Sequence, residues 1–208
     1  MSSSALPTIS GRQVKEVDAL CADRFGIAVE WLMEAAGWEV ARAVKRRAAV
    51  VCGVGNNAGD GFAAARHLHR WGRLESVSCV DLERVQGPAA KELDALGRAG
   101  IEVLEVLDIG RAEWIVDAVF GTGLSRAPGG KFAEWIEAIN AAEKFVLSVD
   151  VPSGLDADTG VAYAPIVRAH MTVTLGLPKP GLAELGGEVV VVDIGIPREA
   201  YAAVGISF

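Results

Sequence analysis

Two aspartates inside apolar segments are the residues of this sequence best suited to chemistry. Asp117 lies in "IVDAVFG", and Asp150 ends the apolar part of "VLSVDVPSG". A buried carboxylate without a partner is costly, so each group must be protonated, hydrogen-bonded or next to a cation. Such a carboxyl can act as a general acid or base or bind a cation. It can equally serve as a structural cap to a neighbouring loop, and the residues alone leave both interpretations open.

Glycine-rich segments follow four of the apolar stretches, at 55–61, 121–126, 150–154 and 176–181. Glycine lets a ligand approach backbone N–H groups closely, and a helix that starts just after such a loop attracts anions. The first segment also holds two asparagines, whose carboxamide oxygens are ligands for hard cations. Glycine and asparagine can also do no more than form a sharp turn from strand to helix. We expect a loop at 55–61 and a ligand crevice where the four segments meet.

Other motifs restrict the chemistry. Residues 53–58 formally fit the dinucleotide fingerprint G-x-G-x-x-G/A, but Asp81 lies further on than the acidic partner of that fingerprint, which follows after about 20 residues. The sequence has no GxSxG, GxxxxGK[ST] or HExxH motif, so nucleophilic hydrolysis and P-loop phosphoryl transfer lack their required parts. Lys179 stands between two prolines, where it could reach a carboxylate or a phosphate or lie exposed.

The elements that must position these residues follow an alternating pattern of strands and helices. Two amphipathic helices are expected first, at 10–25 with Ser10 as N-cap and at 28–47. Short runs rich in valine, isoleucine and leucine then predict strands that are buried on both faces. The sequence therefore predicts a single three-layer α/β domain over 1–208 with a mostly parallel sheet. The strands are expected at 48–54, 76–82, 114–120, 144–150, 171–176 and 188–195, and further helices at 60–72, 87–100 and 130–143.

Composition excludes several classes of partner. The net charge of −7 opposes a general affinity for nucleic acid, because phosphate contacts need clustered lysine and arginine. No apolar run approaches the roughly 18 residues of a membrane span, and the first ten residues lack the pattern of a signal peptide. We therefore expect a cytoplasmic protein that binds neither nucleic acid nor membrane. Cys21, Cys52 and Cys79 lack CxxC spacing and are expected to be buried, reduced thiols.

Five motifs in order resemble the YjeF N-terminal domain family, whose enzymatic members are NAD(P)H-hydrate epimerases. The resemblance covers nearly the whole chain and includes "WLMEAAG" near its start, although Ala58 stands where the family usually has glycine. It implies a Rossmann-like α/β/α sandwich with two N-terminal helices, a homodimer and one bound potassium ion per subunit. The motifs are "GNNAGDGFAAARHL", "VDAVFGTGLSR", "SVDVPSGLDADTG", "LGLPKPGL" and "VVDIGIP".

The resemblance also implies roles for particular residues. Potassium would be held by Asn57, Asp117 and Ser153 with nearby carbonyls. The substrate, hydrated NADH or NADPH (NADHX or NADPHX), has a C6 hydroxyl beside the ring nitrogen. Its epimers interconvert when a C–O or a C–N bond breaks and re-forms, with Asp150 as general acid and base. The segment 121–127 would act as a phosphate loop at a helix N-terminus. Substrate contacts are expected from Asn56, Asn57, Ala58, Gly59, Asp60, Gly121, Thr122, Gly123, Leu124, Ser125, Arg126, Ala127, Asp150 and Lys179.

Two other functional classes stand beside the epimerase. A non-catalytic nucleotide- or protein-binding module on the same scaffold is expected to lose the acid or the loop residues, and both are present here. A conventional dehydrogenase is disfavoured because the nucleotide-binding fold leaves no residues for a substrate domain. The family's companion dehydratase domain is not in this sequence, so the resemblance implies a separate ADP- or ATP-dependent NAD(P)HX dehydratase as pathway partner.

Overall fold

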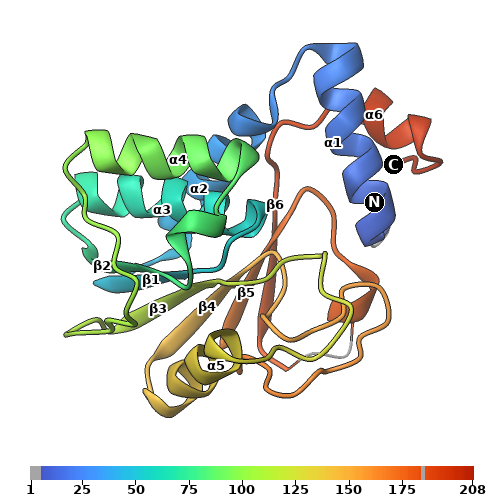
Figure 1. Cartoon of the computed structure of the whole chain (residues 1–208). Coiled ribbons are helices and arrows are strands. Elements are labelled where there is room, and N and C mark those ends of the chain that lie inside the picture. The colour runs from blue at the N-terminus through green and yellow to red at the C-terminus, as the bar shows by residue number, and fades with distance from the viewer. Residues whose placement is uncertain (1–5, 184–185) are drawn as a thin grey trace.

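A single six-stranded sheet, with every neighbouring pair parallel, forms the centre of the computed structural model (Figure 1). The model describes residues 6–183 and 186–208. The strand order is β2-β1-β3-β4-β5-β6, so the chain reverses direction across the sheet between β1 and β3. The strands are β1 (Ala48–Cys52), β2 (Leu74–Cys79), β3 (Trp114–Ala118), β4 (Phe145–Val149), β5 (Met171–Leu175) and β6 (Glu188–Val192).

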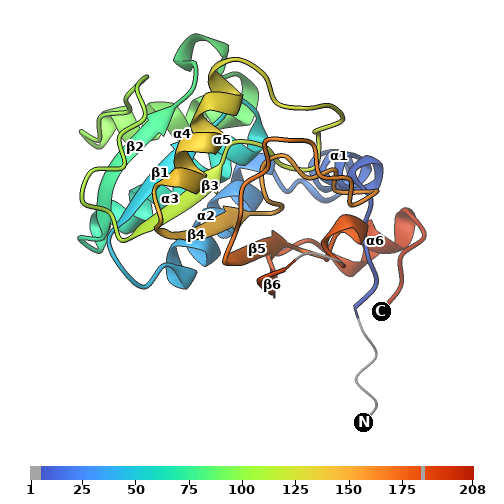
Figure 2. The same ribbon diagram turned by 90° about the horizontal axis from the view of Figure 1, so that it is seen from below.

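Helices cover the two faces of the sheet unevenly. Helices α2, α3 and α4 pack on one face and α5 on the other, while α1 and α6 lie together beyond β5 and β6 (Figures 1 and 2). The arrangement confirms the predicted three-layer α/β fold with two N-terminal helices. The helices are α1 (Gly11–Phe25), α2 (Val29–Ala43), α3 (Asn56–Arg70), α4 (Gly87–Arg98), α5 (Lys131–Ala141) and α6 (Arg198–Ala203).

Glycines allow α3 to lie unusually close to its neighbours. A Cβ at Gly61 would stand 2.6 Å from the Cβ of Ala118 in β3, and a Cβ at Gly37 of α2 would stand 2.4 Å from the Cβ of Ala63. Neither distance is possible between real side chains. The glycines of these helices are therefore needed for space at two interfaces, and α3 is fixed between α2 and the sheet.

Helix α1 is held at its start and along one side. Ser10 and Gln13 form a capping box, which confirms the predicted cap. The N–H of Gly11 donates to Asp158 Oδ1 at 2.7 Å, and Gln13 Nε2 donates to the carbonyl of Val204 at 3.1 Å. The segment that follows β4 and the segment that follows β6 thus position the first helix together.

Most predicted elements are present with shorter bounds, and two expectations were wrong. The predicted loop at 55–61 is helical from Asn56 onward, with Gly55 as the N-cap, because this segment packs closely and needs no left-handed backbone. Strand β6 is partly exposed, since it forms the edge of the sheet. The second helix ends at Ala43, before the predicted basic turn.

The three cysteines are free and buried, as predicted. In the described ranges, 6–183 and 186–208, no helix has both the length and the apolar character needed to cross a membrane.

Candidate active site

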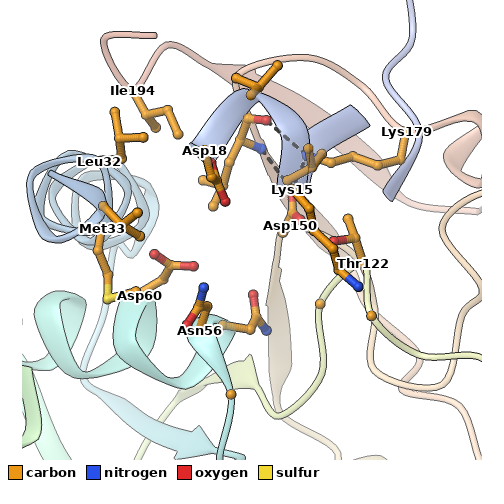
Figure 3. A pocket seen from close by; sticks show the side chains of 18 of the residues that line it. Lys15, Asp18, Leu32, Met33, Asn56, Asp60, Thr122, Asp150, Lys179 and Ile194 are labelled. Carbon is orange, nitrogen blue, oxygen red and sulfur yellow. Dashed lines mark hydrogen bonds and ion pairs between the residues drawn. The ribbon is translucent and has the colours of Figure 1, made fainter. Parts of the chain in front are cut away.

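A cavity of about 420 Å³ opens at the carboxyl ends of β1, β3, β4 and β5 (Figure 3). This is the edge where parallel sheets bind ligands, and the cavity includes the loops of β1 and β3, between which the chain reverses direction. Helices α1, α2 and α3 and Tyr201 of α6 complete its walls. Nine of the residues predicted to bind substrate line it: Asn56, Asn57, Asp60, Gly121, Thr122, Gly123, Leu124, Asp150 and Lys179.

The first turns of α3 bring three polar side chains to the cavity. Asn56 is exposed, whereas Asn57 and Asp60 are buried. The amide nitrogen of Asn57 has no hydrogen-bond partner in the part of the chain that the structure describes. Burial, followed by the negative charges of Asp150 and Asp18, raises the pKa of Asp60 well above its usual range. These positions therefore combine an unsatisfied amide with a carboxyl that keeps its proton.

Asp150 follows the last residue of β4 and has a left-handed backbone, with φ of 67°. Its N–H donates to the carbonyl of Val173 at 2.8 Å, which continues the pairing with β5. A non-glycine residue in this conformation is strained, and such strain is often found at functional sites. The turn directs the carboxyl into the cavity (Figure 3).

The two oxygens of the Asp150 carboxyl have different surroundings. Oδ1 accepts from the N–H of Leu175 at 3.1 Å, from Thr174 Oγ1 at 3.4 Å and from Lys179 Nζ. Nothing in the described ranges donates to Oδ2. Lys179 also donates to the carbonyl of Leu175 at 2.9 Å, and its side chain is only 1% exposed. One oxygen is thus anchored by an ion pair and the other faces the cavity.

Asp117 and Ser153 lie beneath the cavity and do not line it. The fully buried Asp117 carboxyl accepts from Ser153 Oγ at 2.6 Å, Ser148 Oγ at 2.7 Å, the Ser153 N–H at 3.0 Å and the Val119 N–H at 3.3 Å. Burial raises its pKa, although these hydrogen bonds oppose the effect. The N–H of Phe120 donates to Ser153 Oγ at 2.8 Å. Asp117 therefore holds together the loops that follow β3 and β4.

Five predicted substrate contacts do not line the cavity. A Cβ at Gly59 would stand 2.2 Å from the sulfur of Met33, so this residue faces α2. Ala58 is fully buried in the first turn of α3 and needs no glycine conformation there. The predicted phosphate loop at a helix N-terminus is also corrected, because α5 begins only at Lys131, beyond 121–127. The residues outside the cavity are Ala58, Gly59, Ser125, Arg126 and Ala127.

Three polar residues of the cavity were missed by the sequence analysis: Lys15, Asp18 and Tyr201. Burial raises the pKa of Asp18 to about 6, with a further contribution from the negative charge of Asp150 and an opposing one from Lys179. Burial also raises the pKa of Tyr201 well above its usual range. The only feature of the sequence that could have indicated burial of Asp18 is its position next to Val17, at the edge of the apolar stripe of α1.

Comparison with known proteins decides the family. The model of the family described as "YjeF-related protein N-terminus" matches residues 29–181. The chain belongs to this family. The matched range of the YjeF-related family includes Asp150, Lys179 and the start of α3, whereas α1 and α6 with their cavity residues lie outside it.

Individual relatives agree with this assignment. The chain is 44% identical to a protein of Thermofilum pendens named "Bifunctional NAD(P)H-hydrate repair enzyme Nnr", over 89% of this chain and 40% of that protein. It is 35% identical to a protein of Rhodopirellula baltica named "NAD(P)H-hydrate epimerase", over 93% of this chain and 86% of that one. The chain thus spans less than half of the bifunctional relative and most of the shorter one.

A solved structure confirms the fold of this YjeF-related chain. The crystal structure of a yeast protein, YNL200c, superposes with a TM-score of 0.81 at 26% sequence identity. The match covers 97% of this chain and 95% of the yeast chain, so it includes the terminal helices that the family model leaves out.

Proposed function

We propose that this protein is an NAD(P)H-hydrate epimerase, which interconverts the R and S forms of hydrated NADH and NADPH. Relatives named for this activity match over nearly their whole length, at 86% and 92% of their chains. The observation that carries the proposal is the Asp150 carboxyl, which is anchored through one oxygen and open to the cavity through the other.

The reaction needs proton transfer and no redox chemistry. The hydrated ring carries a hydroxyl on C6, next to the ring nitrogen, so C6 can lose its configuration in two ways. Either hydroxide leaves and water returns to the opposite face, or the C6–N bond opens to an aldehyde and closes again. Each route needs a proton removed at one atom and a proton supplied at another. The residues therefore have to supply a base and an acid close to C6.

In the buried ion pair with Lys179, Asp150 is present as a carboxylate. In this form Oδ2 accepts a proton, from attacking water on one route or from the C6 hydroxyl on the other, and returns it in the reverse direction. Asp150 is thus the proposed base in one direction and the acid in the other.

The size of the cavity suits one end of the substrate. A volume of about 420 Å³ accommodates a nicotinamide ring with its ribose, and the rest of the dinucleotide must extend past the rim. There the partly exposed Gly121 and Thr122 and the exposed Gly123 provide backbone. Lys15 of α1 provides a positive charge near Thr122 (Figure 3). We propose this rim as the contact for the phosphates.

Potassium remains a proposal, and three residues fit it. The buried Asp117 carboxyl is contacted only by uncharged donors in the described chain, so a cation beside it would compensate its charge. Asn57 would offer its carboxamide oxygen, which lies 3.3 Å from the place of a Cβ on Gly121, while its unpaired amide nitrogen would remain a donor for the substrate. Ser153 holds the same loop through Phe120. A bound potassium ion would supply a positive charge next to the substrate and keep this loop in place.

Three further expectations also stay proposals. A homodimer would give partners to the exposed Trp31 and Trp38 on α2, and the mass in solution tests this. A separate ADP- or ATP-dependent dehydratase would consume one epimer, an activity that the bifunctional name of some relatives suggests. A cytoplasmic location would place the enzyme with its substrates.

The deciding experiment incubates the purified protein with (R)-hydrate and with (S)-hydrate separately. We expect each to become a mixture of both forms, and Asp150→Asn to abolish this while NADP⁺ still binds. Binding of NADP⁺ without interconversion by the unaltered protein would favour the alternative, a non-catalytic binding module.

A further inference from the structure

The proposed function leaves one requirement open, and the inference drawn from it rests on that function. Asp150 pairs with Lys179 as a carboxylate, so it begins the reaction able to accept a proton and without one to give. The departing hydroxyl or ring nitrogen nevertheless needs a proton. A second group in the same cavity has to supply it.

Few residues of the cavity have a proton to donate. The Tyr201 hydroxyl is too weak an acid, because burial raises its pKa further from neutrality. Lys15 is exposed at the rim. The three protons of Lys179 are used by Asp150, Thr174 and the Leu175 carbonyl. Asp18 and Asp60 remain, and no described residue forms a hydrogen bond or ion pair with either carboxyl. Figure 3 shows both directed into the cavity, Asp18 from α1 and Asp60 from α3.

Position favours Asp18 over Asp60. Asp18 is half-buried on the wall formed by α1, across the cavity from the buried Asp60 of α3, so its carboxyl is more accessible to a substrate (Figure 3). The charge of Asp150 acts on both carboxyls. Asp60 is enclosed more completely in α3, where its proton is held too firmly for ready transfer. We propose that Asp18 is a catalytic residue of the epimerisation, the general acid that acts together with Asp150.

The proton transfers balance on both routes. In hydroxide loss, the ring nitrogen pair forms the C6=N bond, the C6–O bond breaks, and the leaving oxygen takes the Asp18 proton and departs as water. A water molecule then attacks the opposite face of C6 and gives its proton to Asp150. In ring opening, Asp150 takes the hydroxyl proton, the C6–N bond breaks, and its electron pair at nitrogen takes the Asp18 proton. Ring closure on the other face reverses both transfers, since Asp18 takes the N–H proton and Asp150 returns its proton to the aldehyde oxygen. After hydroxide loss and water addition, exchange with solvent restores both carboxyls.

The charged surroundings of Asp18 determine how its proton depends on pH. Its pKa of about 6 reflects burial first, then the negative charge of Asp150, with Lys179 opposing. Helix α2 adds only apolar side chains to this part of the cavity. The acid form is lost as pH rises through this value, so kcat/KM should fall above about pH 6. The titratable groups around it are Lys15, Cys21, Asp60, Asp150, Lys179 and Tyr201.

The test compares Asp18→Asn with the unaltered protein in the interconversion of the two hydrates. We expect kcat to fall by about 100-fold or more, which is the usual contribution of a general acid, while the Kd of NADP⁺ changes little. The decline of kcat/KM above about pH 6 should disappear from the remaining activity. Asp18→Ala, checked for its melting temperature, gives the same test without an amide that could donate a hydrogen bond.

Two control variants sharpen the result. Asp23→Asn changes an exposed acid of the same helix outside the cavity and should leave the rate unchanged. Asp60→Asn should weaken the reaction but keep the decline at high pH. If Asp60→Asn removes this decline, or if Asp18→Asn keeps the full rate and pH profile, Asp18 is not the acid although the epimerase function stands. If the unaltered protein fails to interconvert the hydrates, both the function and this role are wrong.

Discussion

Replacing Lys179 by methionine tests the structural basis of the site most directly. The change keeps the length of the side chain and removes the ammonium group that contacts Asp150, Thr174 and the Leu175 carbonyl. Both partners are buried, with side-chain exposures of 1% for Lys179 and 11% for Asp150. Removing one member of a buried ion pair leaves the other without compensation and typically costs about 3–5 kcal/mol. That is a large part of the about 5–15 kcal/mol that stabilises an ordinary domain.

A double-mutant cycle separates this pair from simple loss of packing. Lys179→Met and Asp150→Asn each leave one uncompensated charge, whereas the double variant leaves none. We expect the double variant to lose at least about 2 kcal/mol less than the sum of the two single losses. Urea unfolding of the four proteins at pH 7 measures the free energies. Lys179→Met should also lose epimerase activity, because the ammonium group that anchors Oδ1 of Asp150 is gone.

A surface pair supplies the matched control. Lys91 contacts Glu30 through a side chain that is 71% exposed, so Lys91→Met should cost about 1 kcal/mol or less. The reasoning about the buried pair fails if Lys179→Met costs no more than Lys91→Met. It also fails if the losses from Lys179→Met and Asp150→Asn are additive within about 0.5 kcal/mol.

The remaining predictions concern stability, packing and the cation. Because burial raises the pKa of Asp18 from 3.8 to about 6, its ionisation opposes folding increasingly from pH 3.8 and in full above about pH 6. Asp18→Asn should therefore be more stable by about 1–3 kcal/mol at pH 7–8. That advantage should vanish as pH falls toward 3.8, and a pH-independent difference in urea unfolding would contradict it. Gly61→Ala should cost about 1–3 kcal/mol by crowding β3, whereas Gly97→Ala, in open space on α4, should not destabilise; thermal unfolding compares them. Exchange of potassium for tetramethylammonium should lower both melting temperature and activity, but the melting temperature of Asn57→Ala should not respond.

The pattern of the sequence was sufficient for the elements and the class of fold. Runs such as 114–120 and 144–150 are too apolar for anything but buried strands, and the intervening amphipathic segments require parallel connections. The order of strands was not predictable, because periodicity does not say to which side a crossover turns. The start of α3 was missed because Gly59 and Gly61 resemble turn residues. In the structure both glycines lie within α3, where the missing side chain makes room for Met33 of α2 and for Ala118 of β3.

The rule that ligands bind at the carboxyl edge of a parallel sheet placed much of the site correctly. Asp150 and Lys179 meet because each directly follows a neighbouring strand or its turn, and the start of α3 reaches the same edge. Asp18 and Tyr201 were missed because helices far apart in the chain bring them there, and no local pattern encodes such a contact. The residues 125–127 were placed too near the ligand, since the chain leaves the edge before α5 begins.

The dependence of α1 on the residues after β6 has a consequence for synthesis on the ribosome. Gln13 bonds to Val204 across 191 residues, and Val17 and Cys21 pack with Ala200 and Tyr201. While the nascent chain grows, the first helix can pack on Leu32 and Leu177, but the part of its stripe that contacts Ala200 and Tyr201 stays uncovered until the last helix emerges. Contacts of such separation also form late in refolding, because the chain must first close a very long loop. An incomplete chain would therefore carry the sheet and Asp150 but could not yet confine a substrate.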